Sequence, residues 1–237
     1  MRTRTPMEAA DLGARLCQSA SRAVYSCYLA VGVPAVVLCL ASYEIADWLP
    51  ALTLWWIKPW LDRTVLFVLA RAAFAQPTTL RDLWDAQRQV LWGQLIRTLT
   101  VRRLSPWRSF TQPVHQLEGL SFLEARRRVL QIRKNKMGSA VLMTSAFSFA
   151  EFGLALALFS LVFWFAPGEG AAADWTSFFT REEVSPWLDF AFYVPYALVI
   201  LFLEPFYVAA GFAMYLSRRA ELEAWDIEQE FRRAFPA

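Results

Sequence analysis

Long apolar runs alternate with polar, charge-rich segments along this chain. Three runs, residues 23–45, 139–166 and 186–216, consist mainly of apolar side chains. A helix rises 1.5 Å per residue, so roughly 20 mostly apolar residues are needed to cross ~30 Å of hydrocarbon. Each of the three runs is therefore predicted to be a membrane-spanning helix.

Residues 48–75 form a fourth, less regular apolar stretch. Two short apolar pieces are joined by the polar sequence Lys58-Pro59-Trp60-Leu61-Asp62-Arg63. Proline lacks the backbone N–H that a helix needs, which predicts a break at Pro59. On hydropathy alone this stretch could span the membrane, re-enter it or lie at its interface.

The distribution of charge decides among these alternatives. Residues 76–138 carry twelve Lys and Arg side chains against four Asp and Glu, and residues 1–22 are also basic. Basic loops stay on the cytoplasmic side, so both segments are expected there. An even number of crossings must separate them, which makes 48–75 a span.

The remaining loops fit the same topology. The loop 167–185 holds four acidic residues and one Arg, as expected outside, and the tail 217–237 is then cytoplasmic. The prediction is an all-α membrane bundle of about four spans, with helical hairpins at 23–75 and 139–216 and both termini in the cytoplasm.

Composition strengthens the membrane assignment and narrows the chemistry. The chain is 57% hydrophobic with eleven Trp, whereas soluble domains are about 45–50% apolar. Its mean hydropathy is +0.30. There is one His, and the three cysteines lie in no metal-ligand spacing. Neither a metal nor another cofactor is predicted.

The basic segment 76–138 is predicted to be largely helical. Apolar residues recur at helical spacing from Leu80 to Leu99, after a capping signal at Thr79. This amphipathic helix could lie on anionic lipid, dock on a partner or pack on the protein itself. Pro106 and Pro113 predict an irregular connection over 101–117, and 118–137 reads as a second basic helix.

The basic side chains of this segment are expected to contact anionic lipid headgroups or a protein partner rather than nucleic acid. The residues concerned are Arg102, Arg103, Arg126, Arg127, Arg128, Arg133, Lys134 and Lys136.

The tail can continue the last span as a helix, because Arg219 and Glu223 stand at i,i+4 and an apolar stripe follows. Packing on the protein itself and docking on a partner are both compatible with this pattern. The residues expected to dock are Arg218, Arg219, Trp225, Ile227 and Phe231.

Ionisable residues at membrane depth are the strongest functional signal. Glu151 and Glu204 each lie twelve residues from the cytoplasmic end of their predicted spans, which is ~18 Å at the helical rise. Unpaired charges there cost at least ~2.5–3.5 kcal/mol. Lys58 and Asp62 can neutralise each other at i,i+4, which leaves Arg63 as counter-ion for one glutamate.

This set of charges could be a proton, ion or substrate path, or an internal ion-pair cluster that fixes helix packing. Two carboxylates at one level would also suit general acid–base catalysis. No nucleophile–base pair, metal set or phosphate-binding glycine loop accompanies them in the sequence. A catalytic role is therefore not predicted.

Several segments resemble a family of uncharacterised bacterial inner-membrane proteins. The resemblance rests on Lys58-Pro59 with Asp62-Arg63, on residues 68–71, 103–106, 108–110, 113–114 and 116–120, and on a longer stretch from Glu204-Pro205-Phe206-Tyr207 through 228. This chain has Ala70 where the family usually has Ser, and Ala75 where Gly is usual. The last span is also similar to the membrane domain found with some glycerophosphodiester phosphodiesterases.

The resemblance implies a role in a larger assembly. Genes of that family often lie beside a MoxR-type AAA ATPase and a transglutaminase-like membrane protein. We therefore expect a non-catalytic membrane scaffold or assembly subunit with partners on the cytoplasmic side. The alternatives are a small transporter or channel component built on Arg63, Glu151 and Glu204, and a lipid-modifying enzyme.

Overall fold

The computed structural model describes residues 5–93, 95–100, 103, 105–165 and 186–234; the side chains of 162–165, 186–192 and 225–234 lie outside that description. All regular structure in these residues is helical, which confirms the all-α class for the described part of the chain. The elements are α1 (Pro6–Ser19), α2 (Ser21–Ala41), η1 (Ser42–Glu44), α3 (Leu49–Ala72), α4 (Leu80–Asp85), the π-helical turn η2 (Arg88–Trp92), α5 (Leu95–Leu99), α6 (Arg108–Leu117), α7 (Phe122–Arg133), α8 (Met137–Phe165) and α10 (Pro186–Ala234).

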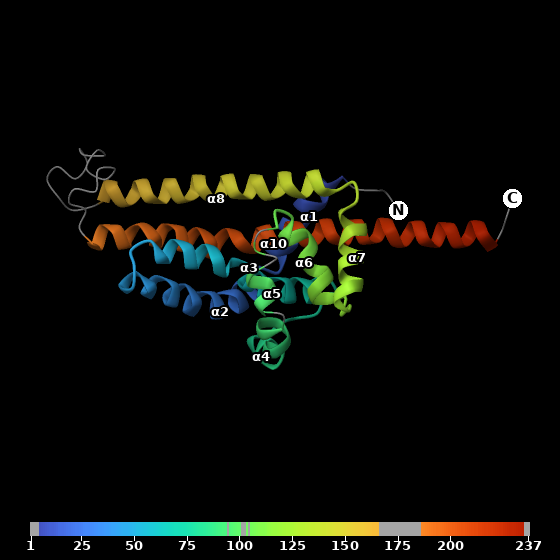
Figure 1. Ribbon diagram of the computed structural model, residues 1–237, viewed down its shortest axis with the longest axis horizontal. Helices are drawn as coiled ribbons and strands as arrows, with labels where there is room; N and C mark the ends of the chain where they lie inside the picture. Colours follow the sequence, from blue (N-terminus) through green and yellow to red (C-terminus); the bar gives the residue numbers. More distant parts are fainter. Residues whose placement is uncertain (1–4, 94, 101–102, 104, 166–185, 235–237) are drawn as a thin grey trace.

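Three helical stretches are long and apolar enough to cross a membrane. They are Ser21–Glu44, Met137–Leu161 and Tyr193–Ala224. These coincide with the three apolar runs of the sequence, so that prediction is confirmed at the level of length and composition. Figure 1 shows α8 and α10 running side by side, with α10 continuing well past the start of α8.

The less regular stretch forms one continuous helix, α3, and the predicted break at Pro59 is wrong. Pro59 removes a single backbone bond, to the carbonyl of Trp55, and helices tolerate this when neighbouring elements hold them in place. The 24 residues of α3 extend ~36 Å. Four charged side chains, at Lys58, Asp62, Arg63 and Arg71, make it less apolar than the other three.

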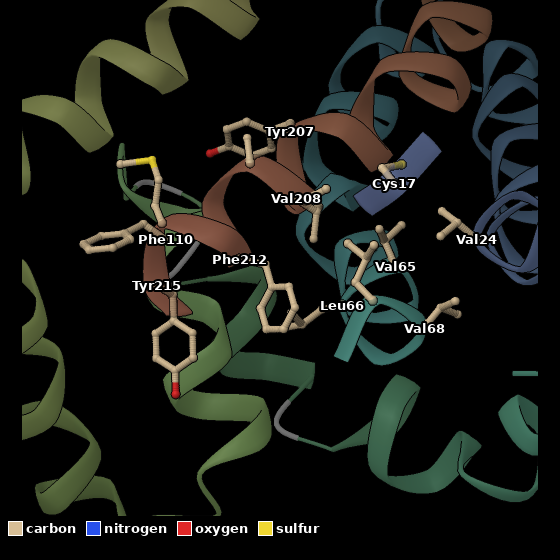
Figure 2. Packing of buried hydrophobic residues seen from close by; sticks show 14 of the residues in the cluster. Cys17, Val24, Val65, Leu66, Val68, Phe110, Tyr207, Val208, Phe212 and Tyr215 are labelled. Carbon is tan, nitrogen blue, oxygen red and sulfur yellow. The ribbon is translucent and has the colours of Figure 1, made fainter. Parts of the chain in front are cut away.

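Helix α10 is the centre of the packing. It contacts α1, α2, α3, α6 and α8. Figure 2 shows Val208 and Phe212 of α10 pointing toward Val65 and Leu66 of α3 in the buried cluster. A side chain on Gly211 would overlap Ser109 of α6, so glycine is what allows α6 to approach α10 this closely.

The N-terminal segment also packs on this centre. Thr5 caps α1 through a capping box with Glu8. The helix then lies against α10 so closely that a side chain on Gly13 would overlap the backbone of Ala209. The N-terminal segment is thus an ordered part of the bundle from Thr5 onward.

The segment 76–138 is more divided than its sequence predicts. The single helix expected from Leu80 to Leu99 is wrong, because α4, η2 and α5 are separate and Gly93 turns away from helical geometry. The connection expected over 101–117 is also wrong in its second half, where α6 forms with Pro113 inside it. The second basic helix ends at Arg133, and Asn135 with positive φ separates α7 from α8.

The two long helices differ sharply in burial. Within an apolar stretch of 18 residues, 67% of the residues of α10 are buried, whereas 6% of those in the corresponding stretch of α8 are buried. Helix α8 packs mainly against α10, with a smaller contact to α1. Most of the α8 surface therefore lies outside the protein core.

Candidate functional site: a buried charge network and its cavity

Two charged residues of α3 begin a buried network. Lys58 and Asp62 stand four residues apart, so they share one face of the helix. The Nζ atom of Lys58 lies 2.6 Å from Oε2 of Glu151 in α8 and 2.8 Å from Oε2 of Glu204 in α10. Lys58 therefore links three helices that are distant in sequence.

Arg108, the first residue of α6, completes the network. Its Nε lies 2.9 Å from Oδ2 of Asp62, and its Nη2 lies 2.5 Å from Oε1 of Glu204. Glu204 thus bridges both cations, and its residue is only 3% exposed. Burial acts to lower the pKa of Arg108, but the nearby carboxylates of Asp62 and Glu204 outweigh it and raise that pKa above its ordinary value.

Packing of α6 places Arg108 there. Phe110 and Val114 of the same helix are fully buried in the main hydrophobic cluster. Ser109 fits against Gly211 of α10. Because these contacts fix the start of α6 between α3 and α10, the Arg108 guanidinium reaches both carboxylates.

The predicted pairing within α3 is wrong. Lys58 and Asp62 form no ion pair with each other, and Arg63 is not the counter-ion of Glu151 or Glu204. Adjacent residues of a helix lie about 100° apart around its axis, so Arg63 points away from the Asp62 face. The transport hypothesis therefore loses Arg63 from its set and gains Lys58 and Arg108.

Arg63 has a structural role in the neighbouring turn. Its guanidinium donates hydrogen bonds to the carbonyls of Gln89 and Val90 and to the hydroxyl of Thr98. The first two carbonyls belong to the π-helical turn η2, which lies between the α-helices α4 and α5. Arg63 thus satisfies backbone acceptors at the point where the expected amphipathic helix is broken.

A cavity of about 470 Å³ lies beside the network, between α3, α8 and α10. Lys58, Arg108, Glu151 and Glu204 reach it from the charged side. The other lining residues are Trp55, Arg103, Ser105, Pro106, Thr144, Phe147, Ser148, Phe152, Ala155, Tyr196, Leu203 and Tyr207. Its walls therefore combine charged, hydroxyl and aromatic groups.

Arg103 is one of these lining residues, so the exposed position that its predicted contact with headgroups or a partner implies is wrong. The residue is 9% exposed, and its guanidinium carbon lies 3.5 Å from the centre of the Trp55 ring. Burial lowers the pKa of Arg103 to about 10, which still leaves it protonated at neutral pH. Charge alone did not distinguish this buried arginine from the exposed ones around it.

The other basic residues predicted to contact headgroups or partners divide into two groups. Arg126, Arg127 and Lys134 are exposed, as such a contact requires. Three have contacts within the chain: Arg128 pairs with Glu118, Lys136 pairs with Glu221, and Arg133 stacks on the ring of Trp107. Arg102 lies outside the described residues.

The predicted C-terminal docking set is described only in part. Arg218 pairs with Glu221 at 2.9 Å, and Arg219 pairs with Glu223 at 2.5 Å. Both arginines are therefore engaged within α10 itself. The side chains of Trp225, Ile227 and Phe231 lie outside the described residues, although the helix runs on to Ala234.

Comparisons with protein-family models, with curated proteins and with solved structures found no match. The resemblance to an inner-membrane family consequently stays a prediction, as do the partners that it implies. The chemistry of the site has to be inferred from its own geometry. That geometry neutralises charge inside a bundle and leaves a polar space that could hold a ligand.

Proposed function

We propose that this chain is an integral membrane scaffold or assembly subunit of a multiprotein complex in the bacterial inner membrane. In this proposal α2, α3, α8 and α10 are four spans, and both termini are cytoplasmic. Helix α3 can serve as a span because Lys58 and Asp62 are neutralised inside the bundle. The basic segment 76–138 then stays on the cytoplasmic side.

The observation that carries the proposal is the exposure of α8. Only 6% of the residues in its 18-residue apolar stretch are buried, although α8 supplies Glu151 to the charge network. A helix held to the protein at one side offers most of its surface to lipid or to another membrane protein. The second use is favoured by what lies on that surface.

Small residues follow the outer face of α8. Ala146, Ala150, Gly153 and Ala157 recur at i, i+4, i+7 and i+11, and all four are exposed. The cavity-lining residues of α8 start two positions earlier, which is about 200° around the helix, so the small residues lie on the opposite face. Membrane helices pack on one another through such small residues because their backbones can approach closely.

The helices of the basic segment 76–138 also expose large apolar side chains. Trp84, Ile96 and Leu123 are 70%, 78% and 64% exposed. We propose that side chains of this segment contact the cytoplasmic part of the complex, with an ATPase of the MoxR type as one candidate partner.

The test is purification of the tagged chain from native membranes in mild detergent. We expect a stoichiometric complex, because α8 needs a partner for its small-residue face. Gly153→Leu should release the partner, since the larger side chain prevents close approach. Leu156→Phe changes an exposed residue of α8 outside the small-residue face and should leave the complex intact. A monodisperse monomer from native membranes would overturn the proposal.

A second candidate function, a transporter or channel component, is favoured by the cavity. One of its charged lining residues, Glu151, lies at the middle of α8, fourteen residues from each end, or ~21 Å. The flux of the transported ion or substrate into proteoliposomes should then be lost in Glu151→Gln, and the variant should still fold. Equal flux in wild type and Glu151→Gln would remove this candidate.

A further inference from the structure

Arg103 is a buried cation that the charge network does not use. Its Nε is buried without a hydrogen-bond partner in the part of the chain that the structure describes. None of the ion pairs found among those residues includes it. The aromatic ring of Trp55 stabilises the cation but accepts no conventional hydrogen bond. A buried guanidinium in this state favours an external acceptor.

A second donor without a partner lies in the same short segment. The hydroxyl of Ser105 is buried and has no hydrogen-bond partner among the described residues. Ser105 and Arg103 both line the cavity. Two donors that lack an acceptor among the described residues thus border one space, which points to a ligand with more than one acceptor oxygen.

The carboxylates beside the cavity do not favour a cationic ligand. Glu204 already contacts both Lys58 and Arg108, and Glu151 contacts Lys58. An incoming ammonium group would have to compete with cations that are held in place. An anion meets no such competition at Arg103.

The size and walls of the cavity describe the rest of the ligand. About 470 Å³ is far more than a single small ion requires and falls in the range of small-molecule sites. Trp55, Phe147 and Phe152 provide apolar walls beside the donors. Such a mixture suits a molecule that has an anionic head and an apolar part.

We propose that this cavity binds the phosphate group of an amphiphile, with Arg103 and Ser105 as its hydrogen-bond donors. A guanidinium matches the geometry of phosphate oxygens through two parallel bonds. A phospholipid headgroup entering from the bilayer and free phosphate share this chemistry. The inference goes beyond the assembly role, and it gives a ligand class to the transport candidate without requiring that the ligand move.

Binding is tested by titrating the purified full chain in neutral detergent with three probes. These are dihexanoyl phosphatidylglycerol, inorganic phosphate and dihexanoyl glycerol, which lacks the phosphate. We expect the phosphatidylglycerol to bind one to one and Arg103→Gln to weaken it at least about tenfold. Binding of inorganic phosphate with the same Arg103 dependence would identify free phosphate as the source.

Two variants control the experiment. Arg133→Gln removes an arginine that also stacks on a tryptophan, at 3.7 Å from Trp107, but does not line the cavity; it should bind like wild type. Ser148→Phe fills the cavity from α8 and should abolish binding even if Arg103→Gln fails to fold. Equal binding of the phosphate-free probe, unchanged affinity in Arg103→Gln, or retained binding in Ser148→Phe would overturn the proposal. The isolated chain is used throughout, so the absence of assembly partners affects none of these outcomes.

Discussion

Helices α8 and α10 are similar in sequence character but opposite in their use. Both are long and apolar, and each carries one glutamate that contacts Lys58. Yet 67% of the residues in the 18-residue apolar stretch of α10 are buried, whereas only 6% of those in the corresponding stretch of α8 are buried. Helix α10 is the axis on which the other helices pack, whereas α8 is attached along one side.

The difference shows that hydropathy reports the ability to enter a membrane, not the position within a bundle. Along α10 the informative residues are the small ones that allow close packing, such as Gly211 beneath Ser109. Along α8 the small residues Ala146, Ala150, Gly153 and Ala157 are exposed, so these four have no packing role among the described residues. We therefore interpret the small residues of α10 as packing positions of the bundle, and we propose that those on the outer face of α8 form an interface.

The largest expected effect comes from Arg108→Ala, which attacks the α10 side of the comparison. Asp62 and Glu204 would lose a shared cation while staying buried, and removal of one partner from a buried pair costs about 3–5 kcal/mol. The free energy of unfolding in mixed micelles measures this loss. Arg126→Ala, at an exposed arginine of α7, is the control and should change stability little.

Neutralising the two glutamates compares the helices directly. Glu204 contacts two cations and its side chain is 3% exposed, whereas Glu151 contacts one and its side chain is 19% exposed. We expect Glu204→Gln to cost about 3 kcal/mol and Glu151→Gln about 1 kcal/mol in the same unfolding measurement. Equal losses would mean that α8 is held in the core as firmly as α10.

The same substitution at two glycines should have opposite consequences. In Gly211→Ala the new methyl group overlaps Ser109, and overpacking typically costs about 1–3 kcal/mol. In Gly153→Ala nothing lies within 4 Å of the new methyl group, so better helix propensity should add up to about 1 kcal/mol of stability. Thermal unfolding of the two purified variants distinguishes them, and a loss in both would contradict the free face of α8.

The smallest effect is expected where α10 leaves the core. Arg219 and Glu223 form an exposed i,i+4 pair, and such pairs contribute about 0.3–0.5 kcal/mol. Arg219→Ala should therefore lower the free energy of unfolding by no more than that, and less at high salt. A loss as large as that of Arg108→Ala would show that the helix end is also part of the core.

The long apolar runs in the sequence predicted the three apolar helices because length and composition are local properties. The pairing of charges was not local. Lys58 and Asp62 satisfy the i,i+4 rule, but each finds a partner 46 to 146 positions away in sequence, since burial requires a counter-ion from a neighbouring helix. Helical spacing gives the shared face of two residues and does not tell which element covers that face.

Arg108 was missed as a site residue for the same reason. In the sequence it is one of twelve basic residues in a segment assigned to the cytoplasm. The available signal was the pair of apolar residues Phe110 and Val114 at i,i+4, which makes the start of α6 amphipathic and able to enter the bundle. Pro106 just before that helix and Pro113 within it instead favoured an irregular connection.

The exposed face of α8 is best tested by photo-crosslinking in native membranes. A photoreactive side chain at Ala150, on the small-residue face, is compared with one at Leu156, which is also exposed. We predict that position 150 yields one protein adduct, that it disappears in Gly153→Leu, and that position 156 mainly yields lipid adducts. Lipid adducts alone at both positions, together with a monomeric chain after purification, would contradict the assembly role.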